Sequence, residues 1–339
     1  MNNKNSPERS SKRPRTKRKT QYRIRNWSEY NAALVERGSL TVWLDEAAMD
    51  GWNNRQKSGK RGASNTYTDS AMLCVLTLQV VYRLPLRATE GLLISLFILL
   101  GLTLPVPDYS TLCRRRKKLS VPLSQTSLNP VLSQGQNLHL VVDSTGFKVY
   151  GEGEWKVRQH GWSKRRTWRK LHLGIDQASG QVRAALVTTP YTSDKAMLPL
   201  LLDQVPEPVT QVSGDGGYDY VDCYEAIAER NAKATISPRC NARIHPRSKR
   251  LKGRNANLER IRELQGRKRR DKNWGRQQWK KESGYHRRSL AETGVMRLKT
   301  IFGDKLGART EQGQECELLL RCAALNRMTG LGMPQSYIL

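Results

Sequence analysis

The chain has 339 residues, enough for two domains of which one buries a full-sized core, and 59 Lys and Arg residues against 30 Asp and Glu give it a net charge of +29. This excess argues against an enzyme of small molecules and indicates a polyanionic partner, DNA or RNA, with a ribosome-associated or merely basic protein as the alternative. The six cysteines and five histidines are dispersed, which excludes a zinc site of ordinary spacing and predicts reduced thiols.

The N-terminal segment, residues 1–25, holds ten Lys and Arg residues and one acid, Glu8. It predicts a disordered basic arm that binds phosphates, with a purely solubilising tail as the alternative. It lacks the apolar region of a signal peptide. The longest apolar run, residues 92–104, is interrupted by polar residues and predicts a core helix. We therefore expect a soluble cytoplasmic protein with no membrane partner.

Residues 26–120 have helical patterning. Helices are expected at 27–37, at 70–82 after the capping pair Thr68 and Asp69, at 87–100, and at 109–119 after the cap Asp108. The last one carries consecutive cations, beginning with Arg114, Arg115 and Arg116. This order predicts an all-helical, helix-turn-helix-like DNA-binding domain whose last helix lies on DNA. The alternative is a helical bundle with a charged outer face. Residues 121–137 have the composition of a linker.

From residue 138 the pattern changes to strands. Strands are expected at 138–143, 171–175, 182–188, 209–213 and 234–236, and helices at 195–204 and 220–231. This order predicts an α/β domain over 138–330, built on a mixed sheet with helices on both faces. Residues 239–281, with 17 Lys and Arg against three acids, are expected to be an insertion.

One further basic window, residues 155–170, contains no acid and predicts a surface that follows DNA. Its cations are Lys156, Arg158, Lys164, Arg165, Arg166, Arg169 and Lys170. In the insertion, Trp274 or Trp279 is a candidate to wedge into distorted DNA, and ordinary packing is the alternative.

Two aspartates are expected at the ends of strands. Asp143 follows four apolar residues, and Asp215 ends another strand and precedes two glycines. Acids in such places are costly unless they are paired or bind a metal ion, although a turn residue is the alternative for each. Asp176 is expected to be a structural turn residue, and Asp219 and Asp222 are expected to be helix caps.

A third acid, Glu292, belongs to a stripe near the C-terminus. In one helix of about 100° per residue, Tyr285, Arg288, Glu292 and Lys299 fall within a stripe roughly 60° wide. The opposite side carries apolar residues for a core. A solvated salt bridge is the alternative for Glu292. If the two strands are adjacent and the helix crosses the sheet, the three carboxylates converge. Such a set selects Mg²⁺ or Mn²⁺, and two such ions would catalyse phosphodiester chemistry.

With these residues the chain resembles bacterial insertion-sequence transposases of the DDE class, in the branch with the Y-x2-R-x3-E-x6-K signature. The signature is complete at Tyr285, Arg288, Glu292 and Lys299, and the aspartates match at V-V-D-S-T-G and S-G-D-G-G-Y-D. The resemblance extends from residue 26 to about 328. It implies an RNase H-like catalytic core in which Asp143, Asp215 and Glu292 hold two Mg²⁺ or Mn²⁺ ions.

The resemblance also implies an activity. The enzyme would bind the terminal inverted repeats, nick the element ends, and transfer the 3′-hydroxyl to target DNA. Arg288, Lys299 and Tyr285 would contact DNA beside the cleavage site. We expect a nucleoid-associated protein that works as a homodimer or larger assembly in its DNA complex. A repressor without catalysis, and a nuclease of the same fold without strand transfer, are the alternatives.

Overall fold

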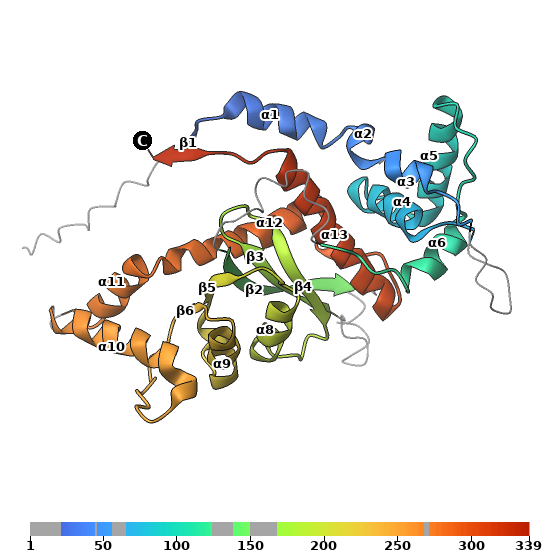
Figure 1. Ribbon diagram of the computed structural model, residues 1–339. Coiled ribbons are helices and arrows are strands. Elements are labelled where there is room, and N and C mark those ends of the chain that lie inside the picture. The colour runs from blue at the N-terminus through green and yellow to red at the C-terminus, as the bar shows by residue number, and fades with distance from the viewer. Residues whose placement is uncertain are drawn as a thin grey trace, which may run out of the picture.

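The computed structural model describes residues 22–44, 46–55, 66–123, 138–149, 168–267 and 271–338. A group of short helices from the N-terminal part lies at one end, a mixed sheet lies in the middle, and a helical hairpin lies at the other end (Figure 1). Three predicted features fall outside the described residues in whole or in part: the basic arm up to residue 21, the linker from 124, and the basic window up to 167.

The sheet has the strand order β4-β3-β2-β5-β6, and β7 pairs with the far end of β2. The strands are β2 (Leu138–Val149), β3 (Trp168–Asp176), β4 (Val182–Thr188), β5 (Val209–Gly214), β6 (Lys233–Ile236) and β7 (Lys305–Leu306). Strand β3 is antiparallel to both of its neighbours, whereas β5 and β6 run parallel to β2. The carboxyl ends of β4, β5 and β6 therefore meet at one edge of the sheet.

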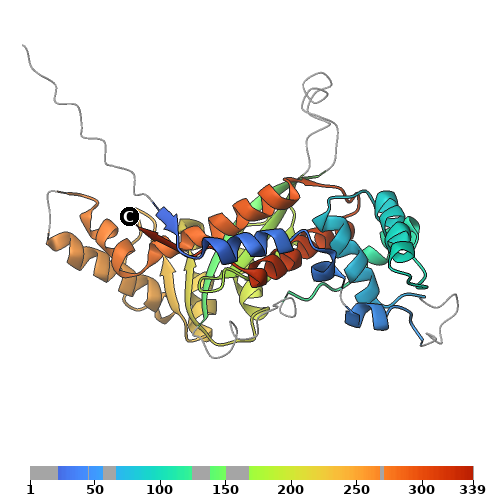
Figure 2. The ribbon, with the colours of Figure 1, turned by 90° about the horizontal axis from the view of Figure 1, so that it is seen from above.

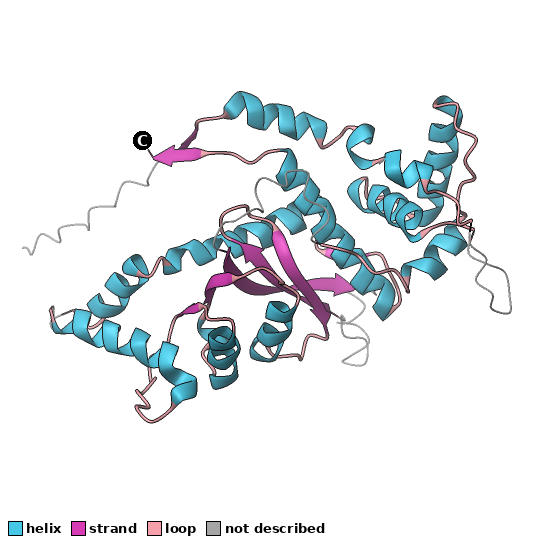
Figure 3. Cartoon of the chain, in the orientation of Figure 1, coloured by secondary structure: helices cyan, strands magenta, loops and turns pink. Residues whose placement is uncertain are grey.

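Helices cover both faces of the sheet, as predicted (Figure 3). Side chains of a strand alternate between faces. Accordingly, Leu140 and Val142 pack into the core beneath α8 (Asp194–Asp203) and α9 (Val221–Glu229). Val141 and Phe147 pack into the other core, beneath α12 (Ser289–Phe302) and α13 (Glu311–Leu331). The mixed α/β architecture predicted from strand and helix order is confirmed.

The four helices predicted in the N-terminal part lie within a few residues of their expected bounds, and two short helices between the first and second were not predicted. The helices are α1 (Trp27–Glu36), α2 (Leu40–Trp43), α3 (Glu46–Asp50), α4 (Asp69–Val81), α5 (Leu86–Leu99) and α6 (Tyr109–Arg116). Thr68 and Asp108 cap α4 and α6 through their side chains. Helix α13 packs against α4, α6 and β4, so these helices share one continuous core with the sheet (Figure 2).

Helices α4 and α5 are strongly apolar. In the described part of the chain no single helix is long and apolar enough to cross a bilayer, although α4 and α5 together, bent by 110°, have that length and composition. Most of α4 is buried in the core, including Met72, Val75 and Leu78.

The two ends of the described chain meet in a small antiparallel sheet. Strand β1 (Tyr22–Ile24) pairs with β8 (Ser336–Ile338), and Tyr22 lies opposite Ile338. This strand differs from the disorder that the basic composition predicts for residues 1–25, because pairing with the C-terminal segment supplies hydrogen bonds that local composition does not reveal.

The predicted insertion is a helical hairpin between β6 and α12. It consists of a short 3₁₀ turn, η5 (Lys249–Leu251), and the helices α10 (Lys252–Gly266) and α11 (Trp274–Glu282). Trp279 is 2% exposed and packs with Leu264 and Tyr285 in a small core of its own. This burial corrects the candidate role of Trp279 as a DNA wedge, because its ring holds the hairpin to the rest of the fold. Trp274 is half-buried.

Candidate active site

The two aspartates lie side by side on neighbouring parallel strands. Val141 of β2 is opposite Ser213 of β5, and each aspartate stands two residues further along its strand. Asp215 directly follows β5, as predicted, and its carboxylate accepts a hydrogen bond of 2.8 Å from the Gly217 amide. Asp143 instead lies in the interior of β2, which continues to Val149. The predicted strand end at Asp143 is wrong, because the polar segment after it pairs with β3.

Glu292 lies on α12, which crosses the sheet on the same face as Asp143. The close packing depends on Gly294, where a Cβ atom would lie 2.5 Å from Ile175 Cδ1 of β3. The single helix predicted through the signature is interrupted: Tyr285–Arg288 form a 3₁₀ turn, η6, after Gly284 with a φ of 70°, and α12 begins at Ser289. The side chains of Arg288 and Glu292 still meet, at 2.6 Å.

The charges of these groups act on Asp143 and Arg288. Burial raises the pKa of Asp143, and the neighbouring charges of Asp215 and Glu292 raise it further, while a hydrogen bond from the Ser144 amide and the charge of Arg288 oppose them. For Arg288, burial works against its charge, but Tyr285 and the three acids together raise its pKa. Arg288 is therefore a cation whose charge is felt by all three carboxylates, and within the described residues it is ion-paired with Glu292.

The donor chemistry of this cluster fits a hard divalent cation, because its three carboxylates offer oxygen ligands and a cation would offset both the burial and the neighbouring acids that raise the pKa of Asp143. The three carboxylates are, however, too far apart to bind one ion together as they stand. Nowhere in the described residues do three His, Cys, Asp or Glu side chains converge closely enough to hold a metal ion. The Glu292 carboxylate is instead paired with Arg288.

The other two signature residues differ in their surroundings. Tyr285 is 8% exposed, and its ring centroid lies 5.7 Å from that of Trp279. Burial raises the pKa of its phenol. The ring is thus part of the hairpin core, while its phenol is influenced by the charges of Arg288 and Asp215. Lys299 is half-buried, with Nζ 5.5 Å from the centroid of the Phe147 ring on the face that carries Asp143.

Most other predicted DNA-binding cations in the described residues are used inside the fold. On β3, Arg169 pairs with Glu311 and bonds Gln314 at 2.7 Å, and Lys170 pairs with Asp194 at 2.9 Å. On α6, Arg115 pairs with Asp69 and Arg116 is 7% exposed. Arg114 alone is exposed in that group. The prediction that all three α6 cations face DNA is therefore wrong for Arg116. Lys164, Arg165 and Arg166 lie outside the described residues.

Three further aspartates were predicted to have structural roles, as a turn residue or as helix caps, and all three lie in the described residues. Asp176 accepts bonds from the Ser179 amide and hydroxyl at 3.0 and 2.6 Å, which confirms a turn residue. Asp222 is in the first turn of α9 without capping it. Asp219 does not cap the start of α9, where Tyr220 is the N-cap residue. Asp219 is buried and accepts from three groups outside its own turn, the Tyr224 hydroxyl, the Arg239 amide and the Arg254 guanidinium.

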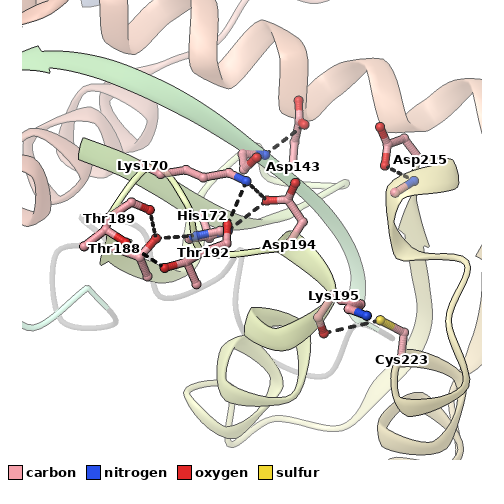
Figure 4. Close-up of polar contacts among 12 residues, drawn as sticks. Asp143, Lys170, His172, Thr188, Thr189, Thr192, Asp194, Lys195, Asp215 and Cys223 are labelled. Carbon is pink, nitrogen blue, oxygen red and sulfur yellow. Dashed lines mark hydrogen bonds and ion pairs between the residues drawn. The ribbon is translucent and has the colours of Figure 1, made fainter. Parts of the chain in front are cut away.

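Behind Asp143, on the α8 face of the sheet, lies a polar cluster that the sequence did not reveal (Figure 4). Asp194 Oδ1 is 2.9 Å from Lys170 Nζ and 3.1 Å from Nδ1 of the fully buried His172. Burial opposes the charge of Asp194, but the neighbouring polar groups of His172, Lys170 and Ser144 hold its pKa far below its usual range. His172 within the apolar strand L-H-L-G was the available signal, because a buried imidazole requires partners.

Two overlapping regions of the chain match protein families with the description "Transposase DDE domain", one over residues 35–152 and the other over residues 134–327. Among solved structures, the chain is similar to the piggyBac transposase in its synaptic complex with hairpin DNA, with a TM-score of 0.40 and 11% identity over 88% of this chain and 74% of that one. The second family region contains all three acids of the cluster and more than half of the chain. The protein therefore belongs to the family of transposases with a DDE domain.

Proposed function

We propose that this transposase is the enzyme of a bacterial insertion sequence, of the Y-x2-R-x3-E-x6-K branch. It binds terminal inverted repeats, cleaves the phosphodiester at the element ends and transfers the 3′-hydroxyl to target DNA. The observation that carries the proposal is the position of Asp143 and Asp215 on adjacent parallel strands, with Glu292 on the helix across the same face. The mixed sheet with helices on both faces is proposed to be an RNase H-like core.

Asp143, Asp215 and Glu292 are the residues that would hold Mg²⁺ or Mn²⁺. When bound, two such ions supply activation of the attacking oxygen and stabilisation of the leaving oxygen. Arg288 has a second role in this scheme. Its charge is felt by all three acids and 27% of its side chain is exposed, so it can turn to a DNA phosphate when Glu292 leaves it. Lys299, two helical turns beyond Glu292, is placed to bind a phosphate of the same DNA strand.

The remaining parts are assigned by position. The helices up to residue 120 are proposed to recognise the element end, with Arg114 as the exposed cation of α6. The cations of the 155–170 window other than Arg169 and Lys170 are proposed to follow the DNA backbone, as is the N-terminal arm. Joining two element ends requires at least two copies of the chain in the DNA complex. A cytoplasmic, nucleoid-associated location follows from this function.

The test is a cleavage and strand-transfer assay with purified protein, DNA carrying the end of the element that flanks its gene, and a supercoiled target. Reactions with Mg²⁺ or with EDTA compare the natural protein with Asp143→Asn and Glu292→Gln. Asp203→Asn, at the exposed end of α8, is the matched control. We expect joining that requires Mg²⁺, is lost in the two site variants and is kept in the control.

Other results assign other functions. Nicking without joining would identify a nuclease without strand transfer. Tight binding of the end without any chemistry, in Mg²⁺ as in EDTA, would identify a DNA-binding repressor. Full activity in Asp143→Asn would contradict the assignment of the acids.

A further inference from the structure

A second group of charged and aromatic side chains lies at the carboxyl edge of the sheet, beyond Asp215. Tyr220 ends the connection that follows β5, Lys195 is in the first turn of α8, and Arg239 follows β6. Lys195 Nζ lies 4.0 Å from the centroid of the Tyr220 ring, and the Arg239 guanidinium carbon lies 4.3 Å from it. Two cations therefore rest over one aromatic ring, which attracts each of them.

The fold holds this group in place through the backbone of Arg239. The buried carboxylate of Asp219 accepts a 2.8 Å hydrogen bond from the Arg239 amide, and Arg276 of the helical hairpin donates to the Arg239 carbonyl at 2.9 Å. The loops after β5 and β6 are thus fastened to each other and to α11. The Arg239 side chain takes no part in this fastening, and it is left free to lie over Tyr220.

The two cations lack acidic partners. In the described part of the chain, neither Lys195 nor Arg239 forms an ion pair with a carboxylate, and the nearby Asp219 is already paired with Arg254 at 2.9 Å. Arg250, an exposed arginine in the same half of the molecule, does have such a partner in Glu225. Two uncompensated positive charges held over one ring repel each other, and a bound anion would relieve this repulsion.

The position of the group relative to the acids indicates which anion it takes. Tyr220 follows Asp215 by five residues in the same connection, and Lys195 follows Asp194 of the cluster behind Asp143. Arg288 and Lys299 lie on the α12 face of the sheet, whereas Lys195 in α8 and Tyr220 at the start of α9 belong to the opposite face, and Arg239 follows β6. A polyanion that crosses the acids would meet cations on both sides.

We propose that Lys195, Tyr220 and Arg239 form a phosphodiester-binding site that holds the DNA backbone on the β6 side of the acid cluster. The ring orders the two cations and adds an aromatic surface against sugar or base. This inference rests on the proposed function, because it assumes that DNA passes the acids, and it adds a contact that the signature residues do not provide.

The experiment measures the salt dependence of DNA binding with a fluorescein-labelled duplex that carries the DNA flanking the gene. The variants are Lys195→Gln, Arg239→Gln and the double variant. A plot of log K against log salt has a negative slope, and each lost phosphate contact should make it about 0.9 less steep. The loss of affinity between about 50 and 200 mM salt should then be roughly 3.5-fold smaller. The double variant should show twice the change in slope.

The matched control is Arg250→Gln, which removes the same charge from an exposed arginine that is already paired with Glu225. Its slope should equal that of the natural protein. Tyr220→Phe, which keeps the ring, should also bind normally, whereas Tyr220→Leu should weaken binding. Slopes in the Lys195 and Arg239 variants equal to that of Arg250→Gln would overturn the site.

The same preparations separate this inference from the proposed function. If the natural protein joins DNA in Mg²⁺ but the slopes do not change, the site is wrong and the transposase assignment stands. If the natural protein neither binds nor joins the DNA, the proposed function itself fails. Circular dichroism of each variant verifies folding, and Lys195→Gln decides alone if Arg239→Gln unfolds, because the Lys195 side chain makes no hydrogen bond within the described residues.

Discussion

Asp143 and Asp194 are half-buried carboxylates on opposite faces of one sheet, and their environments have opposite effects. On the α12 face, burial and two neighbouring acids raise the pKa of Asp143. On the α8 face, the neighbouring groups of His172, Lys170 and Ser144 hold the pKa of Asp194 low. Within the described residues Asp143 forms no ion pair, whereas Asp194 is paired with Lys170 at 2.9 Å. The difference distinguishes a group suited to bind a ligand from a group that positions its neighbours.

The largest effect on stability is expected where the satisfied network is broken. Asp194→Asn leaves Lys170 and the buried His172 without their negative partner, at a cost of roughly 2–4 kcal/mol in the free energy of unfolding. Urea denaturation measures this loss. Asp203→Asn on the same helix should change the free energy by less than about 0.5 kcal/mol. A loss in Asp194→Asn no larger than in this control would show that the network contributes nothing.

The second effect concerns the binding of a divalent ion by the acids on the α12 face. Mg²⁺ or Mn²⁺ at a hundred times its dissociation constant should stabilise the natural protein by about 2.7 kcal/mol. Asp143→Asn should lose this stabilisation, whereas Asp203→Asn should retain it. Thermal unfolding with and without the ion provides the measurement. Equal stabilisation of Asp143→Asn and the natural protein would place the ion elsewhere.

The smallest effect is a pair of pH dependences with opposite sign. Because the pKa of Asp143 is raised in the folded state, its carboxyl contributes to stability below pH 3.8 and this contribution is lost as the pH rises. The natural protein should therefore lose stability relative to Asp143→Asn from pH 3.8 upward. A lowered pKa contributes above 3.8, so relative to Asp194→Asn the natural protein should lose stability as the pH falls below that value. Denaturation at several pH values without metal ions would test both, and parallel curves would contradict the comparison.

Local pattern was sufficient to predict much of the fold and of the acid site. Apolar runs gave the strands up to Asp143 and before Asp215, and caps such as Thr68 and Asp108 gave helix starts within about two residues. Helical spacing placed Arg288 and Glu292 together, although η6 breaks the helix. These features depend on neighbours in sequence.

The features that were missed depend on distant partners. Helix α13 was not predicted because its buried face includes Glu317 and Arg321, which pair at 2.7 Å and obscure the amphipathic pattern. The cations of α6 read as a DNA-binding run, but Arg115 finds Asp69 on another helix. The contact of His172 with Asp194 likewise joins a strand to a helix that local pattern treats separately.

The pairing of β1 with β8 has a mechanical consequence. Because Tyr22 lies opposite Ile338, both chain ends leave the small sheet on the same side, and tension between them would load its three residue pairs one after another. The pairs would open like a zipper before any force reached α13 and the core.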